Sequence, residues 1–215
     1  MGIMFHLQAL SYTSENHTLI LPRIDAVIPP QAISWFHGRS GSGLTTLLRI
    51  LTQHIRPSTG SLIVHYDKLG LSDHATIPQY QQVVGQVYPH VPLFQEWRLY
   101  DNLMFPLEVL NEPYQERHEK VEGMMQLFGL TPYQHTTINL CPKATTLKNI
   151  LARALILSPK ILMIDRILLL LDDDDKQNLL RILHKLTSHG LTVIIADPSP
   201  PVTQPPVCAF GIPSL

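Results

Sequence analysis

The spacing of hydrophobic residues changes several times along this chain, and each change predicts a new element. Short, nearly continuous apolar runs bounded by glycine, proline or polar residues are typical of buried strands. The runs with this pattern are residues 19–21, 26–28, 33–36, 61–64, 83–88, 161–164 and 191–196. Apolar residues three and four positions apart predict helices after Thr45, over most of 99–157, and from Asp172 to Gly190.

Strands that alternate with helices predict an α/β fold whose core sheet is mainly parallel. The run 161–164 has no polar position, as expected of a parallel strand that is covered on both faces. The helical stretch is expected to break at Pro132 and to contain a loop around 140–144. The tail 200–215 is rich in proline and has no helical spacing, so we expect it to wrap the surface or to be loose.

Composition narrows the class of protein. Hydrophobic residues make up 45% of the 215 positions and charged residues 15%, which excludes wholesale disorder. The formal net charge of −1 argues against nucleic acid as a partner. Cys141 and Cys208 form neither a disulfide framework nor a metal motif, which favours a reducing compartment. No apolar run reaches the roughly 18 residues of a membrane span, so a cytoplasmic domain is expected.

A glycine-rich segment stands between the expected strand 33–36 and the helix after Thr45. It matches the phosphate-loop pattern G-x-x-x-x-G-K-[ST] except that Leu44 replaces the lysine. The backbone N–H groups of such a loop cradle phosphate oxygens, and the Thr45 hydroxyl is expected beside magnesium. The residues predicted to bind the phosphates are Gly38, Arg39, Ser40, Gly41, Ser42, Gly43, Leu44, Thr45 and Thr46.

Leu44 is expected to weaken this site. A lysine about 4 Å from a phosphate charge contributes roughly 4 kcal/mol of attraction at an effective dielectric constant near 20. Leucine supplies none of it, and its branched side chain is expected to compete with phosphate for space. A glycine-rich strand-to-helix turn that binds no ligand is the alternative.

Several segments in a fixed order resemble ATP-binding cassette (ABC) ATPase subunits from about residue 5 to 199. The segments are SGSGLTTLLRIL (40–51), RPSTG (56–60), LYDNLMFPLEV (99–109) and LARAL (151–155). The sequences of these segments are most similar to those of the cell-division ATP-binding protein FtsE and of the lipoprotein-releasing and phospholipid-transport ATPases. The resemblance implies a nucleotide-binding domain over 1–199, with an antiparallel β subdomain, a mixed, mainly parallel core sheet and a helical subdomain near 90–157.

The same resemblance implies ATP and Mg²⁺ as ligands and gives roles to single residues. Tyr12, before the first strands, matches the aromatic residue that stacks on adenine, although a core or surface tyrosine fits as well. Asp165 matches the magnesium-side carboxylate that ends the Walker B strand, with capping of a turn or helix as the alternative. The resemblance therefore implies a metal site made by Thr45 and Asp165.

At five places the chain departs from the family pattern. Leu44 replaces the loop lysine, and Pro89 stands where the family has a magnesium-sensing glutamine. Arg166 replaces the glutamate that polarises the attacking water, and Pro198 replaces the switch histidine. Cys141–Thr145 occupies the place of the LSGGQ signature without its serine or glycines. Phosphoryl transfer depends on positioning and charge stabilisation, so we expect hydrolysis at or below background.

Two functions stay open. The first is a pseudo-ATPase that binds ATP weakly and with magnesium, and that acts structurally on a membrane subunit. The second is a diverged ATPase that still drives a transporter or cell-division complex. A decaying gene product is a further alternative.

The resemblance also implies partners. It predicts a place on the inner face of the cell membrane, pairing with itself or another ABC ATPase, and docking of a membrane subunit near 89–109. The residues expected to form an apolar groove there, or else to pack the helical subdomain, are Phe94, Trp97, Leu99, Tyr100, Leu103 and Phe105.

Overall fold

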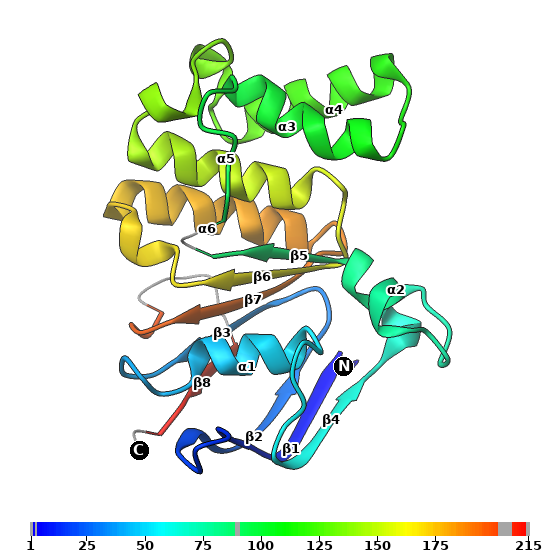
Figure 1. Ribbon diagram of the computed structural model, residues 1–215, viewed down its shortest axis with the longest axis vertical. Coiled ribbons are helices and arrows are strands. Elements are labelled where there is room, and N and C mark those ends of the chain that lie inside the picture. Colours follow the sequence, from blue (N-terminus) through cyan, green and yellow to red (C-terminus); the bar gives the residue numbers. More distant parts are fainter. Residues whose placement is uncertain (1, 3, 89–90, 202–207, 214–215) are drawn as a thin grey trace. The chain divides into compact units, whose positions relative to one another are not determined.

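The computed structural model describes residues 2, 4–88, 91–201 and 208–213 (Figure 1). The chain divides into two compact units. One unit combines Met1–Gly85 with Lys160–Leu215, and the other is Gln86–Pro159. Among the described residues, no helix has the length and apolar character needed to cross a membrane.

The first unit contains an antiparallel sheet with the strand order β2-β1-β4. Its strands are β1 (Phe5–Thr13), β2 (Leu19–Ile28) and β4 (Thr59–Val64). The sequence predicted two short strands where β2 is continuous through Pro22, which is tolerated because β2 lies at the edge of the sheet and loses no inner hydrogen bond. Tyr12 was expected before the first strands, but it lies within β1.

The second sheet has the order β5-β6-β7-β3-β8. Its strands are β3 (Ile33–His37), β5 (Val84–Val87), β6 (Ile161–Asp165), β7 (Thr192–Asp197) and β8 (Cys208–Gly211). The pairs β3–β7, β3–β8 and β6–β7 are parallel, which confirms the predicted α/β fold with a parallel core sheet. The expectation of a tail without regular structure fails at β8, which pairs along β3 at the edge of this sheet.

Helices α1 (Leu44–Leu51) and α6 (Asp173–Thr187) pack on opposite faces of the parallel sheet. Alternate side chains of each strand point to opposite faces. Phe36, Met163 and Ile194 join the hydrophobic core cluster that contains the buried leucines of α1. Trp35, the neighbour of Phe36, points to the other side and faces Leu180 of α6. The same alternation places Asp165 on the α1 side and Asp197 on the α6 side.

The second unit is mainly helical. Its helices are α3 (Leu99–Val109), α4 (Tyr114–Leu127) and α5 (Lys143–Leu155), and α3 packs against both of the others. The expected break at Pro132 is present as the 3-10 turn Thr131–Tyr133. The loop expected around 140–144 is shorter than predicted, because α5 begins at Lys143.

The remaining short elements of the two units are α2 (Ile77–Gln82) and the 3-10 turns Tyr66–Leu69, Ile138–Leu140 and Leu168–Leu170.

Candidate nucleotide-binding site

The glycine-rich segment forms a tight turn between β3 and α1. Gly41 and Gly43 have φ angles of 87° and 84°, in the left-handed region that favours glycine. A Cβ atom at Gly43 would lie 2.5 Å from the Ile20 carbonyl oxygen, so no larger residue fits there. The Ser42 N–H donates to the Arg39 carbonyl at 3.0 Å and closes the turn. The loop therefore has the backbone shape that its glycine pattern predicted.

The loop leads directly into the N-terminus of α1. Gly43 is the N-cap residue, and no side chain caps the first N–H groups of the helix. These N–H groups and the helix dipole favour an anion at this end. The buried Ser42 hydroxyl also lacks a hydrogen-bond partner among the described residues. The arrangement suits phosphate oxygens, which would accept from the uncapped amides.

Leu44 does not occupy the space in front of the loop. Its side chain is only 5% exposed and belongs to the hydrophobic core cluster behind α1. The expectation that leucine competes with phosphate for space is therefore wrong, because an apolar side chain gains more by packing into the core. Replacement of the lysine by Leu44 removes a positive charge but leaves the space for phosphate unchanged.

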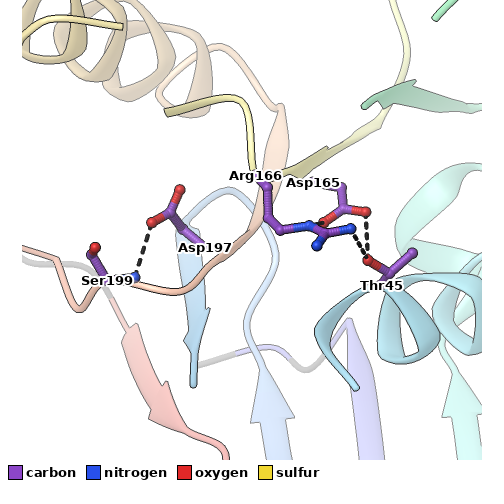
Figure 2. A network of polar contacts seen from close by, with 5 residues as sticks. All are labelled: Thr45, Asp165, Arg166, Asp197 and Ser199. Atoms are coloured by element: carbon purple, nitrogen blue, oxygen red, sulfur yellow. Dashed lines mark hydrogen bonds and ion pairs between the residues drawn. The ribbon is translucent and has the colours of Figure 1, made fainter. Parts of the chain in front are cut away.

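Thr45 and Asp165 meet, as predicted for a shared metal site, but Arg166 joins them (Figure 2). The Thr45 hydroxyl donates to Asp165 Oδ2 at 2.8 Å. The Arg166 Nε donates to Asp165 Oδ1 at 3.2 Å, and its Nη2 donates to Thr45 Oγ1 at 3.0 Å. A guanidinium group thus bridges the two residues that the resemblance assigned to magnesium.

The backbone at Arg166 explains how this side chain reaches Asp165. Consecutive residues of an extended strand point to opposite faces, so continuation of β6 would direct Arg166 away from Asp165. Instead Arg166 has a φ of 51°, which is uncommon for a residue other than glycine. Its N–H donates to the Ala196 carbonyl at 2.8 Å, which fixes this turn against β7.

The residues as they stand do not fit a magnesium ion. A hydroxyl and a carboxylate are the oxygen donors that Mg²⁺ prefers. Here both groups already bind a guanidinium, which is permanently cationic. A divalent cation could reach these oxygens only after the arginine side chain had left them.

Asp197 at the end of β7 is a buried carboxylate that the sequence reasoning passed over. Its Oδ1 accepts from the Ser199 N–H at 3.0 Å, and its Oδ2 has no partner among the described residues. Burial raises the pKa of the Asp197 carboxyl above its ordinary value, against the opposing effects of the Ser199 N–H and Lys176. Figure 2 shows Asp197 turned away from Thr45, Asp165 and Arg166. It lines a pocket of about 360 Å³ beside α6 instead.

Tyr12 and Pro198 are two further predicted positions among the described residues. Tyr12 is half-buried and packs against the hydrophobic core cluster, and its role with adenine stays a prediction. Pro198, at the expected switch-histidine position, is half-buried beside Asp197 and has no titratable group to offer. Pro89, at the expected glutamine position, lies outside the described residues.

The segment in place of the signature has no glycine turn. Pro142 is the N-cap residue of α5, and no side chain caps this helix. Lys143 and Ala144 already belong to the helix, and Thr145 is buried. This segment is the first turn of a helix and contains no glycine, so it lacks the tight turn of the signature.

The predicted apolar groove near 89–109 is only partly correct. Leu99 and Leu103 are fully buried in the helical unit, so they pack its core. Phe94, Trp97 and Phe105 form an aromatic cluster, with ring centroids 4.2 Å apart for Phe94 and Trp97. Phe94 and Trp97 are each 40% exposed. Phe94 and Trp97 therefore give this region an exposed aromatic surface, and Val109 at the end of α3 is exposed as well.

Comparison with known proteins agrees with the fold and the loop. The profile of the ABC transporter family matches residues 21–167. The methionine import ATP-binding protein MetN of Desulfitobacterium hafniense is 28% identical over 86% of this chain and 55% of its own length. The sulfate/thiosulfate import ATP-binding protein CysA of Mycobacterium tuberculosis is 29% identical over 81% of this chain and 49% of its own length. The chain thus spans about half the length of these relatives.

A solved structure gives the same result for the fold. The structure of cbiO1 from Clostridium perfringens, described as part of the ABC transporter complex cbiONQ, superposes with a TM-score of 0.80. The superposition covers 93% of this chain and 80% of that one, at 20% sequence identity. Because the family profile spans most of the chain, the chain belongs to the ABC transporter family of ATP-binding subunits.

Proposed function

We propose that this chain is an ABC-type subunit that binds nucleoside triphosphate weakly, does not hydrolyse it, and acts by docking on a membrane partner. The observation that carries the proposal is the Arg166 guanidinium on Asp165, at the position where the family places its catalytic base. Family members bind ATP and use Mg²⁺ in general. The loss of hydrolysis is the proposal for this chain.

The chemistry of arginine supports the loss of hydrolysis. A guanidinium has five N–H donors and no acceptor, so it cannot take a proton from the attacking water. Asp197 cannot substitute for the base, because its carboxylate lies on the α6 side of the sheet. Loss of a single group that stabilises charge in the transition state lowers rates by about 10²–10³. Loss of the base and the loop lysine together is expected to bring turnover to background.

The loop geometry supports retained but weak binding. The glycine turn and the uncapped start of α1 offer backbone N–H groups to phosphate. Without a lysine at position 44, the charge of the triphosphate is compensated less than in a complete phosphate loop. Weak affinity for nucleotide follows from this shortfall.

The aromatic cluster supports docking of a membrane subunit on the helical unit. Exposed aromatic side chains that stack on one another are typical anchors of protein interfaces. A pocket of about 400 Å³ beside Trp97 is lined by Glu96, Asp101 and Glu108 together with Arg98. Glu108 also pairs with Arg117 at 3.3 Å, so Glu96 and Asp101 are the carboxylates left for a basic ligand. We propose that a short helix of a membrane transporter component binds here, with an apolar side chain on the cluster and a basic one at the carboxylates.

The proposal places the chain at the inner face of a cell membrane, paired with itself or with another ABC ATPase. The relatives reported above are import proteins, and their names specify methionine and sulfate or thiosulfate. The finer resemblance to FtsE and to lipoprotein-releasing ATPases stays a prediction. We assign no transported substrate.

The test is phosphate release from the chain purified together with its membrane partner. We expect the rate to equal that of a protein-free blank, with and without Mg²⁺. Asp165→Ala serves as the control for authentic turnover at this site. Release above the blank that Asp165→Ala abolishes would favour the alternative, a diverged but active ATPase.

A further inference from the structure

We propose that the Arg166 guanidinium takes the place of the magnesium ion, so that this chain binds nucleotide phosphates without a metal. The inference rests on the proposed nucleotide binding and specifies its cofactor requirement. It also replaces the magnesium dependence that the sequence predicted for Thr45 and Asp165.

The Arg166 guanidinium occupies the position that a metal ion would take. Thr45 is the second residue of α1, directly behind the glycine loop, and Asp165 ends β6 beside it. Arg166 donates to one oxygen of each, and these are the two oxygens a metal would need. The residues that would hold the ion thus hold an internal cation of the chain.

The backbone and Asp165 hold the Arg166 side chain in place. The left-handed backbone at Arg166 and its N–H bond to the Ala196 carbonyl direct the side chain back over Asp165. Asp165 is buried, and the guanidinium pairs with one of its oxygens while Thr45 pairs with the other. If the guanidinium left, it would strand a buried carboxylate that has lost its counter-ion, which is costly.

Part of the Arg166 guanidinium remains available to a ligand. The Arg166 side chain is 44% exposed, so part of the guanidinium faces solvent. In the part of the chain that the structure describes, its side-chain bonds are those to Thr45 and Asp165, made by Nε and Nη2. The Nη1 donors are left to bind an anion. The two N–H groups of Nη1 can donate to phosphate oxygens, which a magnesium ion at this place would coordinate directly.

The experiment compares nucleotide affinity with and without metal in the full-length chain. A fluorescent ATP analogue is titrated into the protein in excess EDTA and again in excess MgCl₂. For the unaltered chain we expect dissociation constants that agree within about twofold. For Arg166→Gln we expect at least tenfold weaker binding in EDTA, with recovery in MgCl₂ because Thr45 and Asp165 are then free for the ion.

Two further variants distinguish loss of the cation at position 166 from a general loss of charge or of the fold. Arg181→Gln removes an equal charge from an exposed position on α6 and should behave as the unaltered chain. Arg166→Lys keeps a cation, so its binding should stay independent of metal even if it is weaker. Thermal unfolding of each variant shows whether the fold is kept.

The outcomes are distinct. Tenfold or greater tightening of the unaltered chain by Mg²⁺ would overturn this inference and leave the proposed nucleotide binding standing. Equal affinity of the unaltered chain and Arg166→Gln in EDTA would also overturn it. If neither protein bound the analogue in either buffer, the proposed nucleotide binding itself would fail, and this inference with it.

Discussion

The glycine loop and the segment in place of the signature have the same expected task, which is to present backbone amides to phosphate, yet only the loop keeps the required turn. At the loop, Gly43 packs against the Ile20 carbonyl, so the fold itself requires a glycine there. At the other segment, Pro142 caps a helix whose Leu147 and Leu151 are buried. Geometry that the packing needs has survived, whereas geometry that serves only a ligand has changed.

The retained glycine loop does not by itself indicate that the chain binds nucleotide. Because packing alone explains Gly43, its presence is not evidence that nucleotide is bound. Arg166 is more informative, because its partly exposed side chain joins Thr45 and Asp165, the two residues that the resemblance assigned to magnesium. Substitutions can therefore distinguish the residues that stabilise the fold from those that would bind a ligand or partner.

The largest expected effect is on stability, at the two loop glycines. Gly43→Ala adds a Cβ atom 2.5 Å from a backbone oxygen at a left-handed position, and should lower the free energy of unfolding by about 3 kcal/mol. Gly41→Ala has a similar φ but open space, so it should cost only about 1 kcal/mol. Denaturant unfolding measures both. Equal losses would show that packing does not explain the retained loop.

The next effect concerns the aromatic cluster, the one exposed surface of the helical unit to which we assign a partner. Trp97→Ala should weaken binding of the membrane subunit about thirtyfold, which corresponds to about 2 kcal/mol for a central interface aromatic. Tyr114→Ala removes another exposed ring, on α4 and outside the cluster, and should have no effect. Pull-down of the membrane subunit with a dilution series reads out both. If the Trp97→Ala variant retained the membrane subunit as well as the parent does, the docking site would lie elsewhere on the chain.

A smaller effect is expected from restoring the lost charge at the loop. Leu44→Lys can keep its aliphatic stem in the core while its ammonium reaches toward the phosphates. We expect about tenfold tighter binding of nucleotide, about 1.4 kcal/mol, with some loss of stability. Isothermal titration compares it with Leu44→Met, which keeps the packing without a charge. No gain over Leu44→Met would place the phosphates away from this loop.

The smallest effect concerns Asp197 and depends on pH. Its pKa is raised by burial, so the folded state holds the proton more tightly than the unfolded state. The free energy of unfolding therefore falls as the pH rises from the unfolded pKa through the folded one, and stays reduced above it. Asp197→Asn removes this cost and should stabilise the chain by about 1 kcal/mol at about pH 7.5, with little gain at about pH 4.

Thermal unfolding at the two pH values checks this, with Asp73→Asn as a matched change at an exposed position. An Asp197→Asn variant that is less stable than the parent at both pH values would mean that the carboxylate is needed by the fold. Asp197 would then be a residue that stabilises the fold.

Most of the fold could be predicted from the sequence, because the apolar strands and the spacing of the helices reflect burial directly. The continuous β2 was missed because Pro22 indicates a break unless the strand is known to lie at an edge. The strand β8 was missed because four residues in a proline-rich tail carry too weak a pattern, and their partner, β3, is distant in sequence.

The candidate site was less predictable. The loop, Thr45 and Asp165 follow from spacing and from the family resemblance. The role of Arg166 does not, because alternation along a strand directs it away from Asp165, and only the left-handed turn reverses this. Asp197 was missed because a polar residue at a strand end gives no sign of whether water reaches it.

The most direct test of the account is the fate of bound nucleotide in the assembled complex. The chain, together with its membrane partner, is incubated for hours with Mg²⁺ and with ATP at a concentration similar to that of the protein, and the nucleotide in the unwashed mixture is identified by chromatography. We predict that it is ATP, in the same proportion as in a sample that is analysed at once. Recovery of ADP in amounts that match the protein, prevented by Asp165→Ala, would contradict the claim that this subunit binds without hydrolysing.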